Sequence, residues 1–249
     1  MCPIFQFSLL SSLAFGAAGI LMAVMGAGGS LLALPAFLVI LKVPMPQAIA
    51  ASSAVVGMAA FSTFLDEKNR ASLPKTPAVW FLLPLLLGSL AGALVLPWIE
   101  TRFLAFLLVT LLAWAGWNAL RTGSQEVGHL RALPLSGAGA GVGLLMGVLG
   151  VGGGFLAVPS LQRWGGIEHE RAISLSLLGI GLGAALSLFL HWQEGAFRIG
   201  LVLPALMAVL IGMEIGTHLR RRLPPGFQSR VFGGVLWVVA LGVLVKTLG

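Results

Sequence analysis

The chain has 249 residues, of which 58% are hydrophobic and only 9% are charged, and its mean hydropathy is +1.00. Soluble domains are about one quarter charged, so this composition excludes a water-soluble fold. The formal net charge is +7, but the basic residues stand at the ends of apolar stretches and not along one face. They therefore indicate membrane topology, and we expect no nucleic-acid partner.

Apolar stretches follow one another along almost the whole chain. A transmembrane helix needs about 20 mostly apolar residues. The first stretch has no positive segment before it and leads into further stretches, so we expect a membrane segment and not a cleaved signal peptide. The sequence predicts an all-α membrane protein in the lipid bilayer, with stretches at 7–25, 30–41, 46–65, 77–99, 103–120, 133–149, 153–162, 171–191, 197–219 and 227–247.

The two halves of the chain repeat each other at an offset of 124 residues. The segment 19–35 aligns with 143–159, and ten of these 17 positions are identical, where chance predicts about two for average residue usage. The same offset aligns Gly88 and Gly92 with Gly212 and Gly216. We therefore expect a first transmembrane repeat at 1–120, a linker at 121–132 and a second repeat at 133–249.

The basic residues favour inverted repeats. If each Gly-rich break is the tip of a helical hairpin, each half has five segments and the two faces carry 11 and 4 basic residues. If each break lies within one spanning helix, the split is 7 against 8. Only the hairpin arrangement satisfies the positive-inside rule, so we expect a broken or re-entrant hairpin and three transmembrane helices in each half. Both termini are then outside the inner membrane, and the linker is cytoplasmic.

A Gly-rich break interrupts each half at an equivalent position. Glycine permits the positive φ angles and close approaches that an interrupted membrane helix needs. The helix after each break is short, so its N-terminus starts within the membrane, where unpaired N–H groups and the helix dipole favour an anion. The alternative is that these glycines only allow close helix packing. The expected anion-binding residues are Gly26, Gly28, Gly29 and Ser30 in the first break and Gly150, Gly152, Gly153 and Gly154 in the second.

Both halves carry a GxGGxxxxxP element that ends at Pro35 or Pro159, followed by an Ala-x-x-x-Ser stretch that ends at Ser52 or Ser176. Pro35 and Pro159 are expected to break or gate the helices that follow the Gly-rich breaks. These elements resemble the TauE/SafE family of sulfite and organosulfonate exporters. The resemblance covers essentially the whole chain and implies a secondary transporter, expected to be an exporter, for a small anion such as sulfite or a sulfonate. Ser30 aligns with Gly154, so the two half-sites are chemically unequal.

Polar residues at membrane depth extend this hypothesis. The hydroxyls of Ser52 and Ser176 can donate to an anion, although membrane serines more often bond their own helix or a neighbour. Ser53 is a weaker candidate because its repeat partner is not a serine. Buried ionisable residues in membrane segments are functional candidates, so His191 and Glu214 are candidates for proton coupling. Interfacial, solvated positions are the alternative for both.

Two other functions compete with a transporter. An anion channel also uses opposed half-helices. An intramembrane serine hydrolase would need Ser30 as nucleophile and His191 or His218 as base, but no recognisable spacing supports it, and we expect no enzyme activity. Cys2 is the only cysteine, so no cysteine-based metal site or cofactor is expected. The predicted partners are a small anion, protons and the bilayer, with a homo-oligomer as a further candidate.

Overall fold

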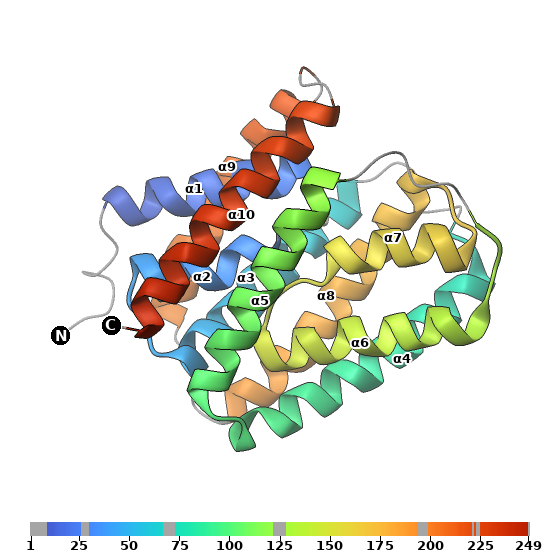
Figure 1. Cartoon of the computed structure of the whole chain (residues 1–249), viewed down its shortest axis with the longest axis horizontal. Helices are drawn as coiled ribbons and strands as arrows, with labels where there is room; N and C mark the ends of the chain where they lie inside the picture. The colour runs from blue at the N-terminus through green and yellow to red at the C-terminus, as the bar shows by residue number, and fades with distance from the viewer. Residues whose placement is uncertain are drawn as a thin grey trace.

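The computed structural model describes residues 9–25, 30–66, 73–121, 128–193, 199–220, 222 and 225–248, and no strand occurs among them. The elements of the first half are α1 (Leu9–Met25), α2 (Ala33–Pro35), the π-helix η3 (Ala36–Ile40), α3 (Met45–Asp66), α4 (Lys75–Val95), the short 3-10 helix η5 (Leu96–Trp98) and α5 (Thr101–Arg121) (Figure 1). The second half contains α6 (Ala132–Leu149), α7 (Gly154–Gly165), α8 (His169–Gln193), α9 (Ile199–Arg220) and α10 (Pro225–Leu248).

Five of the described helical segments are long and apolar enough to cross a membrane. They are Met45–Leu65, Lys75–Trp98, Thr101–Leu120, Ala132–Leu149 and His169–Leu190. Large apolar side chains also cover the outside of the bundle, such as Leu133, which is 86% exposed, and Val245, which is 71% exposed. Such a surface is stable in contact with lipid and unfavourable in water. The predicted all-helical class is therefore confirmed for the described residues.

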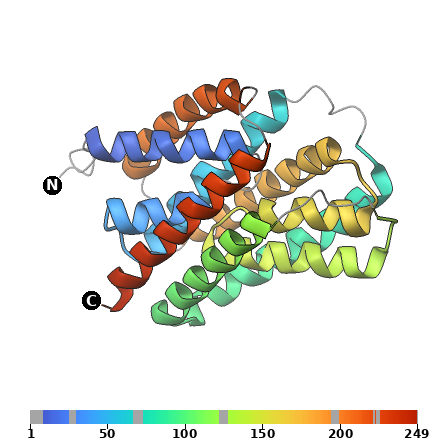
Figure 2. The same cartoon turned by 45° about the horizontal axis from the view of Figure 1, so that its top comes forward.

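The helices of the two halves pair in a reciprocal way. Helix α1 of the first half packs along α9 of the second, and α6 of the second half packs along α4 of the first (Figures 1 and 2). Helices α3 and α8 pack on each other, as do α5 and α10. An offset of 124 residues relates the first residues of α3, α4 and α5 to those of α8, α9 and α10. Each long helix of one half thus packs against a helix of the other half.

Close glycine contacts give the directions of the pairs that join α1 to α9 and α4 to α6. In α6, Gly139 approaches Phe81 and Gly143 approaches Leu85 of α4, so the residue numbers of both helices rise together. In α9, Gly212 approaches Gly16 and Gly216 approaches Ile20 of α1 in the same sense. Both pairs are parallel. Small residues let membrane helices approach until their backbones touch, which maximises dispersion contacts.

Two other pairs, α3 with α8 and α5 with α10, consist of helices that the 124-residue offset relates to each other, and these pairs are antiparallel. Gly57 of α3 approaches Ala184 of α8, whereas Phe61, one turn further along α3, approaches the earlier residue Gly181. In the other pair, Gly116 of α5 approaches Trp237 and Leu120 approaches the earlier Gly233 of α10. Helices α3 and α8 are therefore antiparallel, and so are α5 and α10. The first residues of α1 and the last residues of α10 lie at the same end of the bundle (Figure 1).

Both short helices end in the same backbone motif. The N–H of Val43 donates to the carbonyl of Phe37 at 3.2 Å, and the N–H of Ile167 donates to the carbonyl of Leu161 at 3.3 Å. This bond is typical of a Schellman motif, which needs a residue with positive φ just before the donor. That residue is Gly166 in the second half, with φ +63°, and Lys42 in the first, with φ +51°. A side chain in this left-handed region costs about 1–2 kcal/mol, whereas glycine adopts it freely.

Replacing Lys42 by glycine should therefore stabilise the protein. Relief of the left-handed strain exceeds the extra entropy that glycine gives the unfolded chain, so we expect a net gain of about 0.5–1 kcal/mol. The measurement is the thermal unfolding midpoint in detergent, with Lys42→Ala as the matched control because alanine removes the charge but keeps the Cβ atom. Equal midpoints for the glycine and alanine variants would contradict this explanation.

Candidate substrate site

The second Gly-rich break is a tight, buried turn between α6 and α7. Helix α6 ends at Leu149, and Gly150 follows with φ +61° while its N–H donates to the carbonyl of Met146 at 2.8 Å. Helix α7 then begins at Gly154 with Gly153 as its N-cap. Because glycine has no side chain that could accept from the first N–H groups of α7, this helix terminus offers backbone donors to a ligand.

The first break reaches the second one through a serine hydroxyl. Ser30 is 4% exposed, and its Oγ donates to the carbonyl oxygen of Gly152 at 2.6 Å. Gly26, Gly28 and Gly29 lie outside the described residues. The hydrogen bond from Ser30 joins positions 122 residues apart in the sequence, so it brings the described end of the first break against the second.

Helix α3 forms a wall of this site. Ser52 is fully buried, and its Oγ donates to the carbonyl of Gly150 at 2.9 Å. A Cβ atom added to Gly152 would lie 2.9 Å from Cγ1 of Val56, and one added to Gly150 would lie 2.6 Å from Oγ of Ser53. The glycines therefore let the turn between α6 and α7 approach α3 more closely than any other residue type would allow.

Two buried hydroxyls have no hydrogen-bond partner among the described residues, and one of them lies beside Gly150. They belong to Ser53, which is 2% exposed, and to Ser176, which is fully buried. A buried hydroxyl without a partner is costly, so such groups call for an explanation, and a ligand is one. The offset of 124 residues relates Ser176 to Ser52 and Gly26 to Gly150, but Gly26 lies outside the described residues.

Ser53 and Val56 contribute more to the site than the sequence indicates. The repeat gave Ser53 less weight because its counterpart is Leu177. In the structure, Ser53 lies beside Gly150 and Val56 lies beside Gly152. The repeat partners of both positions are apolar, so the repeat does not mark either residue as part of a site. Helical spacing could have identified Val56 from the sequence, because residues four apart on α3, such as Ser52 and Val56, lie on the same face of the helix.

The two prolines at equivalent positions of the repeat, Pro35 and Pro159, have different local structures. Pro35 ends α2, and the π-helix η3 begins at the next residue, whereas Pro159 lies inside α7, which continues to Gly165. Proline lacks an N–H donor and clashes with the carbonyl four residues earlier, and a π-bulge is one way to absorb this clash. Both prolines were expected to break or gate the helices, and only Pro35 lies at a change of helix type.

Of the two candidates for proton coupling, the structure describes the side chain of Glu214. The side chain of Glu214 is 77% exposed, with its Oε1 3.8 Å from Nδ1 of His218, whose side chain is 75% exposed. The described structure includes the backbone of His191 in α8 but not its side chain. Glu214 is thus not part of the buried site around Gly152.

A serine hydrolase finds no support in this geometry. The Oγ of Ser30 donates its proton to a carbonyl oxygen, whereas a nucleophilic serine donates to a base. His218 is exposed, and its Nδ1 lies 2.9 Å from the carbonyl of Glu214 in its own helix. Among the described residues, no group of three or more His, Cys, Asp or Glu residues could hold a metal ion.

A buried Gly-rich turn within a bundle of long apolar helices is typical of membrane transporters. The chain belongs to the sulfite exporter TauE/SafE family, whose model matches residues 11–243. The predicted resemblance to this family is therefore confirmed.

Curated relatives carry transporter names. The chain is 28% identical over 242 residues to a "Probable membrane transporter protein" of Xylella fastidiosa strain Temecula1, and the alignment covers 93% of each chain. It is also 28% identical over 168 residues to the "Probable inner membrane transporter protein TsaS" of Comamonas testosteroni, which covers 64% of this chain and 68% of that protein. No solved structure matches the chain.

Proposed function

We propose that this chain is a secondary transporter that exports a small anion, with sulfite or an organosulfonate as substrate. The observation that carries this proposal is the hydrogen bond from Ser30 to Gly152, through which the two breaks meet in the buried interior. The N-terminus of α7 at Gly154 offers N–H groups and the positive end of a helix dipole. An anion can be bound there without a buried lysine or arginine.

Inverted repeats around this site would provide alternating access. The parallel packing of α1 with α9 and of α4 with α6, together with antiparallel packing of α3 on α8 and of α5 on α10, is the pattern expected if each helix of one half is reversed in the other. This pattern supports two repeats at 1–120 and 133–249 in opposite orientations. Rocking of one repeat against the other would then expose the breaks to each side in turn.

Serine hydroxyls would complete the anion site. Ser30 and Ser52 now donate to the carbonyls of Gly152 and Gly150, and rotation about χ1 would turn each donor toward an anion oxygen. Ser53 and Ser176 are buried donors whose hydrogen bonds an anion would supply. Hydrogen bonds to a charged acceptor are stronger than those between neutral groups, which would offset part of the desolvation of the anion.

Flux measurements in proteoliposomes test this function. We expect saturable flux of sulfite or methanesulfonate, compared with thiosulfate and chloride, with and without a pH gradient. Stimulation by the gradient would indicate proton coupling, for which Glu214 and His191 remain the predicted groups. Ohmic single-channel currents would instead identify an anion channel, and the absence of flux for all four anions would overturn the proposed substrate class.

Alanine at Ser53 should separate stability from transport. Because the Oγ of Ser53 has no partner among the described residues, its removal costs no hydrogen bond there, and we expect unchanged or slightly raised stability with weaker anion transport. Alanine at Ser52 removes the donor to the buried Gly150 carbonyl and should cost about 1–3 kcal/mol. Thermal midpoints and KM measured on both variants check this, and an unchanged KM in Ser53→Ala would exclude Ser53 from the site.

A further inference from the structure

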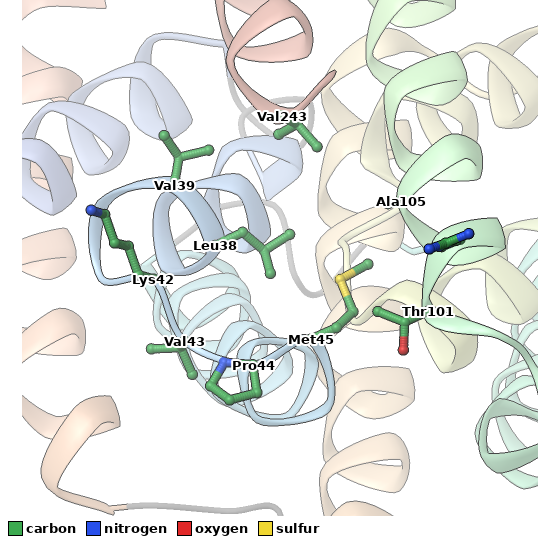
Figure 3. Close-up of a pocket in the computed structure, with 10 residues that line it drawn as sticks. Leu38, Val39, Lys42, Val43, Pro44, Met45, Thr101, Ala105 and Val243 are labelled. Atoms are coloured by element: carbon green, nitrogen blue, oxygen red, sulfur yellow. The ribbon is translucent and has the colours of Figure 1, made fainter. Parts of the chain in front are cut away.

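A cavity opens at the end of the bundle where α10 ends. It has a volume of about 380 Å³ and lies between the end of η3, the start of α3, the start of α5 and the last turns of α10. Leu38, Met45 and Val243 point toward its centre, and Thr101 lies across from them (Figure 3). Lys42 stands at its rim with the ammonium group turned outward.

Two basic residues and no acidic residue are among the described residues that line the cavity. Lys42 and Arg102 both line it, and neither makes an ion pair among the described residues. Glu100 precedes Thr101 in the chain but is exposed and does not line the cavity. Helix α5 begins at Thr101, so its N–H groups and dipole add to the positive potential.

Lys42 and Arg102 belong to the few basic residues that the predicted topology places on the outer face of the membrane. The predicted topology places four basic residues on the outer face, namely Lys42, Arg102, Arg198 and Lys246. Two of the four line this single cavity, and Lys246 follows Val243 by three residues on α10. Basic residues are depleted on the outer side of membrane proteins, so their concentration at one cavity favours a role in binding over a role in topology.

Short helical segments connect this cavity to the Gly-rich breaks. Helix α3 begins at Met45 in the cavity lining and reaches Ser52 seven residues later, about 10 Å along the helix. The segment from Ser30 to Lys42 joins the same two places from the other side. The buried side chains of Leu38, Val43 and Met45 form an apolar wall of the cavity.

We propose that this cavity is a second anion site, a vestibule in which Lys42 and Arg102 gather the transported oxyanion before or after it passes the apolar wall of Leu38, Val43 and Met45. This inference rests on the proposed transport function. Two cations at the mouth of a low-dielectric cavity raise the local concentration of anions, and the effect weakens as salt screens the charges. The vestibule should therefore act on apparent affinity and leave the maximal rate to the site at the breaks.

The test compares sulfite and methanesulfonate flux in proteoliposomes for the wild type and for Lys42→Gln/Arg102→Gln. At low ionic strength we expect a rise in KM of about threefold or more with little change in kcat, and we expect the difference to shrink at high salt. The charge-conserving variant Lys42→Arg/Arg102→Lys should keep the KM near the wild-type value. Glutamine keeps the Cβ atom at position 42, so the backbone strain is unchanged.

A matched control removes the same charge from the other end of the bundle. Arg131 precedes α6 and Arg171 lies in the first turn of α8, both exposed, so Arg131→Gln/Arg171→Gln loses two charges and should keep its KM. An equal rise in both double variants would indicate a general charge effect and overturn the vestibule. An unchanged KM in Lys42→Gln/Arg102→Gln overturns it while the transport function stands.

Two molecules could place an oxyanion in the cavity, the dissolved substrate and an anionic lipid through its headgroup. Flux is therefore measured in vesicles of phosphatidylcholine alone and in vesicles that also contain phosphatidylglycerol. The vestibule requires the rise in KM in both. A rise only in phosphatidylglycerol vesicles would assign the cavity to a headgroup and overturn the proposal. A wild-type chain that moves neither anion would overturn both this inference and the proposed function.

Discussion

Leucine in place of Gly152 should abolish transport while the protein still inserts into the membrane. A Cβ atom at this position would collide with the side chain of Ser30 and lie 2.9 Å from Cγ1 of Val56. A whole leucine side chain therefore has no space unless the two breaks separate, which would destroy the proposed anion site. We expect at least a 100-fold fall in flux, on the order of 3 kcal/mol of lost binding or barrier stabilisation. Flux in proteoliposomes and the amount of membrane-extracted protein are the two measurements.

A control on the same half separates this local effect from a general loss of fold. Gly141 of α6 is exposed, and a Cβ atom added there meets nothing within 4 Å, so Gly141→Leu should transport normally. The smaller change Gly152→Ala, combined with Ser30→Gly, removes the serine side chain from the collision and should restore much of the stability. Normal flux in Gly152→Leu would contradict a substrate site at the breaks.

Valine in place of Gly143 should prevent the bundle from forming. A Cβ atom at Gly143 would collide with the backbone carbonyl of Leu85 and lie 2.8 Å from the backbone nitrogen of Ser89. Backbone atoms cannot rotate away as side chains do, so α4 and α6 must move apart and lose contacts along their length. Overpacking in a rigid core costs about 1–3 kcal/mol, and we expect a loss at or above the upper end of this range.

The measurement for Gly143→Val is the fraction of monodisperse protein after extraction in mild detergent, together with its thermal midpoint. Gly141→Val is the matched control because it lies two residues away on the same helix, in open space. The control should behave as the wild type does. If both variants extract equally well, α4 and α6 do not pack through their glycines.

Much of the helical layout could be predicted from the sequence. The stretch expected at 133–149 is α6, which spans Ala132–Leu149, and the short segment expected at 153–162 corresponds to α7 at Gly154–Gly165. The helix ends could be predicted because glycine and charged residues are common at helix termini. The break around Gly150 could be predicted for the same reason, because a buried turn with positive φ favours glycine.

Packing partners could not be predicted in the same way. The spacing of Gly139, Gly143 and Gly147 indicates a flat helix face, but nothing in it says that α4 is the helix that covers this face. A small-residue face fits many apolar helices equally well, and the choice among them depends on contacts far apart in sequence. The π-helix after Pro35 escaped prediction too, since the equivalent Pro159 lies within a continuous α-helix.

The reciprocal pairing of helices has a consequence for how the protein is made. Helix α1 is synthesised long before its parallel partner α9, which begins only at Ile199, so the glycine face of α1 stays uncovered in the membrane until α9 has been made. Neither half can bury its own glycine faces alone. Two separate polypeptides, one for each half, should therefore assemble only when both are produced in the same membrane.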